Sequence, residues 1–209
     1  MQENLKSKRA GIDEKALTGR KVLLRDWEEK DLDSYGHWLQ PGHAWHQFDA
    51  PYYKADTPEE INARLAKLKD QVLTRNFPEP RGTLVVADKT TSALIGRVNS
   101  YWESKETNWL SIGIDLYDAA LWGRGLGYEA LGIWTDYVFS ARPELARLGL
   151  ATWSGNRGMM RLAEKLGFKE EARFRKARII NGEFFDSMGY GVLREEWTAR
   201  FPDSFAAQL

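Results

Sequence analysis

Three glycines at every second position, Gly123, Gly125 and Gly127, stand between an alternating apolar segment, 109–116, and a segment with helical spacing, 130–138. Glycines let backbone N–H groups converge without a Cβ in the way, and a helix N-terminus adds the positive end of its dipole. A strand, a glycine turn and a helix in this order predict an anion site for a phosphate or pyrophosphate. The alternative is a purely structural turn from strand to helix.

The spacing of these glycines excludes two common phosphate loops. A P-loop requires Gly-Lys-Ser/Thr after its last glycine, and none follows here. The dinucleotide fingerprint separates its second and third glycines by two residues, whereas a single residue separates them in this chain. The turn alone therefore leaves the identity of the anion open.

Composition narrows the class of protein. The 209 residues fit one domain with a substantial core. Thirty basic and 30 acidic residues give no electrostatic basis for binding nucleic acid or an anionic membrane. The absence of cysteine excludes disulfides, thiolate metal sites and a cysteine nucleophile. No apolar run has membrane-spanning length and the first residues lack a hydrophobic signal, so we expect a cytoplasmic protein.

Turn and cap signals divide the rest of the chain into elements. Thr57-Pro58 with Glu60 forms a capping box before an amphipathic helix, and Asp31 or Asp33 is suited to cap an earlier one. Asn181-Gly182 is the strongest hairpin signal. The expected strands are 21–25, 83–87, 93–98, 109–116, 147–153, 168–180 and 183–193, and the expected helices begin near 31, 57, 126 and 156. We expect tails at 1–20 and 201–209 and one domain at 21–200.

Two motifs in this order of elements resemble those of the GNAT superfamily of acetyl-CoA-dependent N-acetyltransferases. The motif Gln/Arg-x-x-Gly-x-Gly/Ala falls on 122–127, with Trp122 in the first place, and Asn-x5-Leu-Tyr-Glu-Lys-x-Gly-Phe falls on 156–168. The resemblance covers about 21–197 and is strongest to the branch of bacterial ribosomal-protein alanine N-acetyltransferases. It implies an α/β fold: a mixed, mostly antiparallel sheet with a splayed parallel strand pair, flanked by about four helices.

The resemblance also implies acetyl-CoA as co-substrate. The pyrophosphate is expected on the amides of 123–127 and the pantetheine arm along 114–116, between the splayed strands. Arg124 is expected either to contact phosphate or to be a solvated turn residue. The cofactor-binding residues expected on this basis are Ile114, Leu116, Trp122, Gly123, Arg124, Gly125, Leu126, Gly127, Tyr128, Asn156 and Lys165.

The implied reaction is direct transfer of the acetyl group to a primary amine in a ternary complex, which needs no protein nucleophile. The acceptor is expected to be a small molecule, an amino-acid-like metabolite or a protein N-terminus. About a tenth of an α-amine is neutral at pH 7, but well under a thousandth of a lysine. The need for a general base therefore depends on the acceptor.

This chain departs from the family at two catalytic positions. Ala163 stands where a tyrosine often acts as general acid, and Ser111 stands where a carboxylate is often found. As replacements we expect Asp115 or Glu103 to act as base or to orient water, although Asp115 is equally suited to a surface or capping role. Hydrogen-bond donors toward the leaving thiolate are expected from Ser154 or Asn156.

An aromatic segment near the first helices is expected to form a wall of the acceptor site, as the resemblance implies. The expected residues are Trp45, Phe48, Tyr52, Tyr53, Trp102 and Phe185. Packing of helices on the sheet is the alternative for about half of these rings. The three histidines within 37–46 lack a complete ligand set, so no metal is predicted. The resemblance suggests a homodimer, and we expect no nucleic-acid or membrane partner.

A second function remains open at this point. With Ala163 and Ser111 at the expected catalytic positions, the chain also fits a coenzyme A-binding module with degenerate catalysis. A different nucleotide-binding α/β protein would need parallel strands throughout. The hairpins expected at 88–92 and 181–182 oppose that alternative.

Overall fold

The structure, a computed structural model, describes residues 17–209. Its strands are β1 (Val22–Arg25), β2 (Thr83–Asp88), β3 (Leu94–Ser104), β4 (Trp109–Leu116), β5 (Arg147–Trp153), β6 (Lys169–Ile180) and β7 (Glu183–Leu193). Its helices are α1 (Asp31–Leu39), α2 (Pro58–Thr74), α3 (Leu126–Ala141), α4 (Arg157–Leu166) and α5 (Arg194–Arg200), with short 3-10 turns η1 (Ala44–Gln47), η2 (Ala119–Leu121) and η3 (Ala206–Gln208). The predicted α/β class is confirmed, with α5 in addition to the expected helices.

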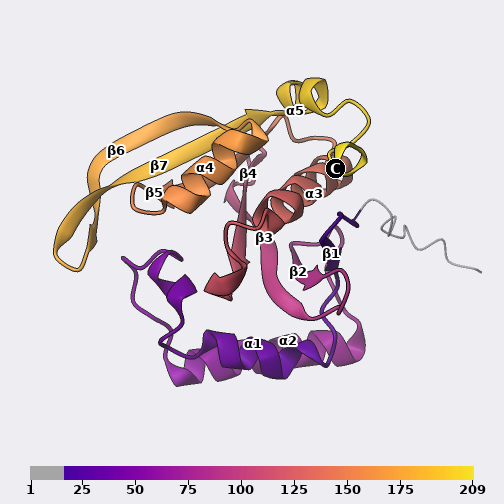
Figure 1. Cartoon of the computed structure of the whole chain (residues 1–209), viewed down its shortest axis with the longest axis vertical. Coiled ribbons are helices and arrows are strands. Elements are labelled where there is room, and N and C mark those ends of the chain that lie inside the picture. The colour runs from indigo at the N-terminus through magenta and orange to yellow at the C-terminus, as the bar shows by residue number, and fades with distance from the viewer. Residues whose placement is uncertain (1–16) are drawn as a thin grey trace, which may run out of the picture.

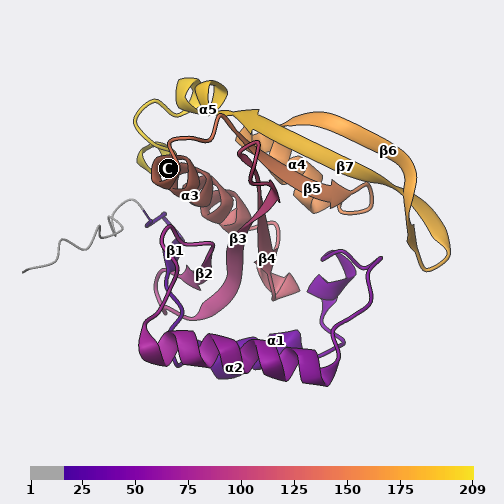
Figure 2. The ribbon, with the colours of Figure 1, turned by 180° about the vertical axis from the view of Figure 1, so that it is seen from behind.

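The strands form one sheet in the order β1-β2-β3-β4-β5-β7-β6 (Figures 1 and 2). All neighbours are antiparallel except β4 and β5, which run parallel. The β4–β5 pairing covers only Leu110 with Leu148 and Ser111 with Gly149, after which the two strands diverge. This confirms the splayed parallel pair that the family resemblance implies.

Helices cover both faces of the sheet and make two hydrophobic clusters. One cluster joins β1–β5 and β7 to α3, α4 and α5 and includes Trp134, Leu131 and Ile112. The other packs α1, α2 and η1 on the opposite face and includes Tyr35, Trp45 and Tyr117. Figures 1 and 2 show α1 and α2 side by side, away from α3 and α4. The region between these layers, where β4 leaves β5, is therefore bordered by both groups of helices.

Local sequence signals account for the ends of several elements. Thr57 and Glu60 form the predicted reciprocal capping box of α2. Asn156 caps α4, which ends at Gly167 with φ +95°. The β6–β7 turn places Asn181 and Gly182 at positive φ, as a two-residue hairpin requires.

Both segments that we expected to be tails supply core residues where the structure describes them, and residues 1–16 of the first segment lie outside the described part. Leu17 is buried against the cluster that includes Trp134. Near the other end, Phe201 and Phe205 are buried beside Trp197 of α5, and Asp136 of α3 accepts hydrogen bonds from the Trp197 indole and from the amide of Phe205. These aromatic contacts hold residues 201–209 on α3.

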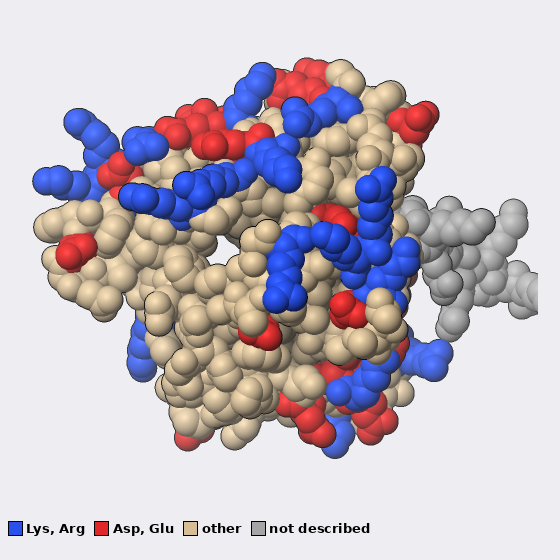
Figure 3. Space-filling view, in the orientation of Figure 1, with Lys and Arg blue, Asp and Glu red and all other residues tan. Residues whose placement is uncertain are grey.

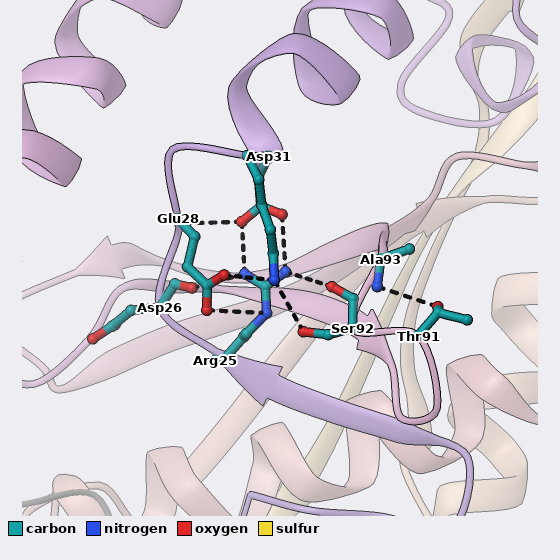
Figure 4. Close-up of polar contacts among 8 residues, drawn as sticks. Arg25, Asp26, Glu28, Asp31, Thr91, Ser92 and Ala93 are labelled. Carbon is teal, nitrogen blue, oxygen red and sulfur yellow. Dashed lines mark hydrogen bonds and ion pairs between the residues drawn. The ribbon is translucent and has the colours of Figure 1, made fainter.

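A buried ion pair ties α1 to the sheet (Figure 4). The guanidinium of Arg25, at the end of β1, donates to both carboxylate oxygens of Asp31 at 2.6 and 2.8 Å, and also to the carbonyl of Ser92 in the β2–β3 turn. Asp31 further accepts from the Glu28 amide at 2.9 Å. The predicted capping role of Asp31 or Asp33 is wrong: Lys30 occupies the N-cap without a side-chain bond, because Arg25 attracts the Asp31 carboxylate.

We predict that Asp31→Ala lowers the free energy of unfolding by about 3–5 kcal/mol, because it leaves the Arg25 guanidinium buried without its partner. The matched control is Glu170→Ala, which removes the exposed partner of Arg173 and is expected to cost less than about 1 kcal/mol. Chemical denaturation of both variants measures the difference. Equal losses would show that the Arg25–Asp31 pair does not anchor α1.

Candidate active site

The divergence of β4 from β5 leaves one edge of β4 without a strand partner. Tyr117 donates its amide to Ile95 of β3, so strand alternation turns the polar backbone groups of Leu116 and Ile114 toward the opposite edge. The Leu116 carbonyl confirms this direction, since it accepts the Trp122 indole N–H at 2.9 Å. Figure 3 shows a small opening through the molecule below α4 on this side. An extended ligand can therefore pair with β4 there.

The glycine turn stands next to this free edge. Gly123 and Gly125 have φ of +74° and +85°, a conformation that favours glycine. No side chain caps the N-terminus of α3, so the amides of its first turn lack intrahelical acceptors. Lys21 donates its ammonium to the Arg124 carbonyl at 2.8 Å and so adds a positive charge beside the turn. This arrangement has the features of the anion site that the sequence predicts, and the binding of an anion stays a prediction.

Basic side chains continue from the turn across α4. Arg157, Arg161 and Lys165 are exposed at intervals of four residues, which places them on one helical face. Figure 3 shows the resulting row of positive charge above the opening. The Lys165 ammonium also lies 4.5 Å from the centre of the Tyr128 ring, in the first turn of α3. Both predicted cofactor residues therefore lie together at the α3–α4 junction.

On the other side of the opening, the segment after η1 bridges to the end of β5. The Phe48 carbonyl accepts hydrogen bonds from the Trp153 indole and the Asn156 amide, both at 3.3 Å. The Phe48 ring contacts Trp122 edge-on at 5.3 Å. Residue 48 thus joins the first helical layer, the end of β5 and the glycine turn at one point.

A cleft of about 590 Å³ separates this segment from the β6–β7 hairpin. It is lined by Gly42, His43, His46, Gln47, Phe48, Pro51, Trp153, Ile180, Asn181, Glu183 and Phe185. At its edge, the Arg178 guanidinium lies 4.3 Å from the centre of the Tyr52 ring and so connects the hairpin to the opposite wall. Burial lowers the pKa of His46, which favours its neutral form.

The two predicted general bases lie at different ends of the β3–β4 face. Asp115 accepts from Arg97 at 2.7 Å, and Arg97 also donates to the Tyr35 hydroxyl at 3.0 Å. Burial is the largest single influence and lowers the Arg97 pKa, but Asp115 together with the hydroxyls of Tyr117 and Tyr35 raises this pKa well above its usual value. Glu103 instead accepts from the Ser111 hydroxyl at 3.0 Å. Six residues of β3 separate Arg97 from Glu103, about 20 Å along a strand, so the two carboxylates do not share a site.

Ser111 stands where a carboxylate is often found in the family, and its contact with Glu103 brings a carboxylate to that position. Ser111 has no carboxylate of its own, but β3 brings the Glu103 carboxylate to its hydroxyl. Ser111 is also in the last pair that joins β4 to β5. A carboxylate therefore stands close to the point where the strands diverge, supplied by the neighbouring strand.

The two predicted hydrogen-bond donors both lie after β5. The Ser154 hydroxyl accepts from the Asp186 amide at 2.9 Å, which leaves its own proton free to donate. Asn156 uses its carbonyl oxygen to cap α4 through Met159, at 3.0 Å, and one amide proton to bind Phe48. Asn156 thus links the segment after η1 to the N-terminus of α4.

The predicted acceptor residues divide between the cleft and the core. Phe48 and Phe185 line the cleft, and Tyr52 stands at its edge. Tyr53 is exposed. Trp45 is buried, with its indole bonded to the Trp38 carbonyl, and Trp102 packs toward α3 with Arg142 over its ring. These last two rings have the packing role that we considered as the alternative.

The structure adds residues that sequence reasoning missed. Lys21 reaches the glycine turn, Arg178 of β6 lies over the Tyr52 ring, and Asp49 follows Phe48 and is bonded to η1 through its amide. No local pattern marks them, because each comes to the site through contacts between distant segments. Trp153 and the histidines of η1 also line the cleft. Within residues 17–209, no three His, Asp or Glu side chains are arranged to hold a metal ion.

None of the helices in the described part of the chain is both long and apolar enough to cross a membrane.

Comparison with known proteins agrees with this geometry. The curated relative "Uncharacterized N-acetyltransferase YoaA" of Bacillus subtilis (strain 168) is 25% identical over 144 residues, which cover 68% of this chain and 79% of the relative. A GNAT-family acetyltransferase from Bacillus anthracis superimposes with a TM-score of 0.67 at 20% identity, over 86% of this chain and 99% of that one.

A second similar structure contains ligands. It is the spermidine N-acetyltransferase from Vibrio cholerae in complex with CoA and spermine, with a TM-score of 0.65, 20% identity and coverage of 84% and 97%. The family model for the acetyltransferase (GNAT) domain matches residues 21–169, which span both the glycine turn and α4. The chain therefore belongs to the GNAT family of acetyltransferases.

Proposed function

We propose that this protein transfers the acetyl group of acetyl-CoA directly to a primary amine within a ternary complex. The observation that carries the proposal is the free edge of β4 beside the uncapped N-terminus of α3. The edge supplies backbone partners for an extended amide chain, and the helix N-terminus binds a diphosphate. Coenzyme A combines both chemical features in one molecule.

Different residues around the turn bind different parts of coenzyme A. Backbone amides of 123–128 face the pyrophosphate, while Ile114 and Leu116 offer amide and carbonyl groups to the pantetheine arm. Lys21 holds the turn through the Arg124 carbonyl and adds charge beside the phosphates. Lys165, on the basic face of α4, lies near enough to Tyr128 to serve the same anionic end.

The cleft on the other side of the opening suits an amine acceptor. Aromatic side chains, Phe48, Trp153 and Phe185, supply apolar and π surfaces that favour cations. Glu183 is the carboxylate among the lining residues. The structurally similar protein that holds spermine is a spermidine N-acetyltransferase, which supports an amine acceptor in this fold.

The reaction needs little protein chemistry beyond placement and charge. Binding brings the amine and the thioester carbonyl together, which supplies most of the rate enhancement in a direct transfer. The Ser154 proton, which no protein acceptor occupies within residues 17–209, is available to stabilise the departing thiolate. Ala163, on the buried face of α4, has no side-chain proton to donate and cannot perform that role.

A second candidate function is a coenzyme A-binding module without turnover. The loss of the family's usual side chains at Ala163 and Ser111 favours it. The Glu103 carboxylate beside Ser111 and the free Ser154 proton favour the enzyme instead.

We predict that the protein releases free thiol from acetyl-CoA when it meets a suitable amine. A panel of polyamines, amino acids, peptides with free N-termini and aminoglycosides is incubated with acetyl-CoA, and thiol is followed with a chromogenic disulfide. Release above the no-enzyme and no-amine blanks, with an acetylated product seen by mass spectrometry, is the expected result. Tight CoA binding without turnover on any amine would favour the binding module.

We further predict that Gly125→Val weakens binding of coenzyme A by at least about tenfold, or about 1.4 kcal/mol. A β-branched side chain does not tolerate φ of +85°, so the turn must shift its amides. The matched control is Gly182→Val, which places the same strain, at φ +82°, in the β6–β7 turn. Titration calorimetry with CoA is the measurement, and equal affinities in the two variants would show that the turn does not bind the phosphates.

A further inference from the structure

Asp49 occupies the junction of the site without a structural task of its own. It directly follows Phe48, whose carbonyl is bonded to Trp153 and Asn156 and whose ring contacts Trp122. The Asp49 amide donates to the Trp45 carbonyl at 3.1 Å, which fixes the backbone to η1. Asp49 is therefore held where the acceptor cleft meets the open edge of β4.

The carboxylate of Asp49 is free, in contrast to the other acids nearby. Within residues 17–209, no hydrogen bond or ion pair reaches it, and the side chain is accessible to solvent. Asp115 is bonded to Arg97, and Asp56 is paired with Arg64. Asp49 lies between Phe48 and Pro51, which both line the cleft. An unpaired carboxylate beside the cleft can take up a proton without breaking an existing bond.

Protein surrounds Asp49 on most sides despite its access to water, and this raises the pKa of its carboxyl to about 6. Burial is the largest cause, and the negative charge of Asp115 on β4 acts in the same direction, as does Asp56 before α2. Arg97 on β3 and Arg64 on α2 oppose the shift. The other titratable groups that face it are the hydroxyls of Tyr52 and Tyr117.

We propose that Asp49 is the general base that takes a proton from the acceptor ammonium before acetyl transfer. The inference rests on the proposed function, because it needs an amine in the cleft. It assigns Asp115 a different role from the one expected from sequence. Asp115 is held by Arg97, and its negative charge raises the pKa of the neighbouring Asp49 carboxyl.

The proton balance is complete with the groups present. The ammonium gives one proton to the Asp49 carboxylate and becomes a neutral amine. The amine nitrogen forms a bond to the thioester carbonyl carbon, and the carbon–sulfur bond breaks as the tetrahedral intermediate collapses. The second proton passes from nitrogen to the thiolate, which leaves as free thiol, while Asp49 returns its proton to solvent through the open cleft. The products are an amide, free coenzyme A and one released proton.

The predicted pH dependence follows from the sign of the shift. Asp49 accepts a proton only when it is ionised, so kcat/KM falls as the pH decreases through about 6. Above that value kcat/KM is level until the acceptor amine itself loses its proton. The full chain is assayed with the amine that gives the fastest thiol release, from pH 5 to 9.

Asp49→Asn is expected to lower kcat/KM by about a hundredfold or more at pH 7 and to abolish the limb near pH 6. The remaining rate should rise steadily with pH, following the neutral fraction of the amine. Binding of acetyl-CoA and the thermal melt should be unchanged, since the carboxylate has no bond to lose. The matched control is Asp70→Asn, the same change at an exposed position on α2. This variant is expected to keep the wild-type kcat/KM and its decrease near pH 6.

Arg64→Gln tests whether nearby charges set the pKa of Asp49, because it removes a charge without changing a residue that lines the cleft. Arg64 is half exposed and paired with Asp56, and its charge lowers the Asp49 pKa. Its removal should therefore move the acid limb of kcat/KM to higher pH. A normal rate and an unmoved limb in Asp49→Asn would overturn the assignment while leaving the acetyltransferase function intact. Failure of the wild-type protein to acetylate any amine would instead overturn the function on which it rests.

Discussion

β4 and β5 cannot remain paired along their whole length, and the rest of the site depends on this constraint. They share two residue pairs, at Leu110–Leu148 and Ser111–Gly149, and then separate. On the far side, β5 continues its full register with β7, and β4 continues its register with β3. The sheet is thus held together by its outer partners while the central gap remains open.

Each half of the molecule is then placed relative to that gap. On one side, the glycine turn and α3 follow directly from the free end of β4, and the Trp122 indole returns to the Leu116 carbonyl. On the other side, Phe48 is fastened to Trp153 and Asn156 at the end of β5. The glycine turn therefore lies on one side of the gap and the cleft on the other, and the Phe48 and Trp122 rings, with centroids 5.3 Å apart, join the two sides. Direct transfer between two bound substrates requires such an arrangement.

The charges in the site differ in how firmly they are held. Arg97 neutralises Asp115, and Ser111 binds Glu103, so these carboxylates are fixed by protein partners. Within residues 17–209, the Asp49 carboxylate has no such partner, and its side chain is exposed to solvent. The negative charge of Asp115 raises the pKa of Asp49, and we propose that Asp49 takes the proton of the acceptor. Groups with perturbed pKa values are common at active sites.

The elements defined by local signals could be predicted from the sequence. The capping box at Thr57, the Asn156 cap and the Asn181-Gly182 turn each depend on residues close together in the chain. The glycine turn was predictable for the same reason, and with the second motif it led us to expect coenzyme A as its ligand. The sheet order was expected only through the family resemblance, because pairing of distant strands leaves little local trace.

The side chains of the acceptor site were harder to predict. Aromatic character alone does not reveal which face a ring occupies, so Trp45 and Trp102 were assigned to the acceptor site although both pack in or against the core. Asp49 lies in an irregular segment without periodicity. Its pKa is raised by burial and by Asp115, which is distant in sequence. Lys21 is likewise brought to the glycine turn by the packing of α3 beside β1.

We propose above all that one molecule of coenzyme A contacts both the open edge of β4 and the glycine turn. Amide hydrogen exchange, resolved by residue with and without coenzyme A, tests it most directly. The account predicts slower exchange for the amides of Ile114 and Leu116 together with those of 123–128 when the ligand binds. Protection of the glycine turn alone, or of segments outside both regions, would contradict it, because the pantetheine arm would then lie elsewhere.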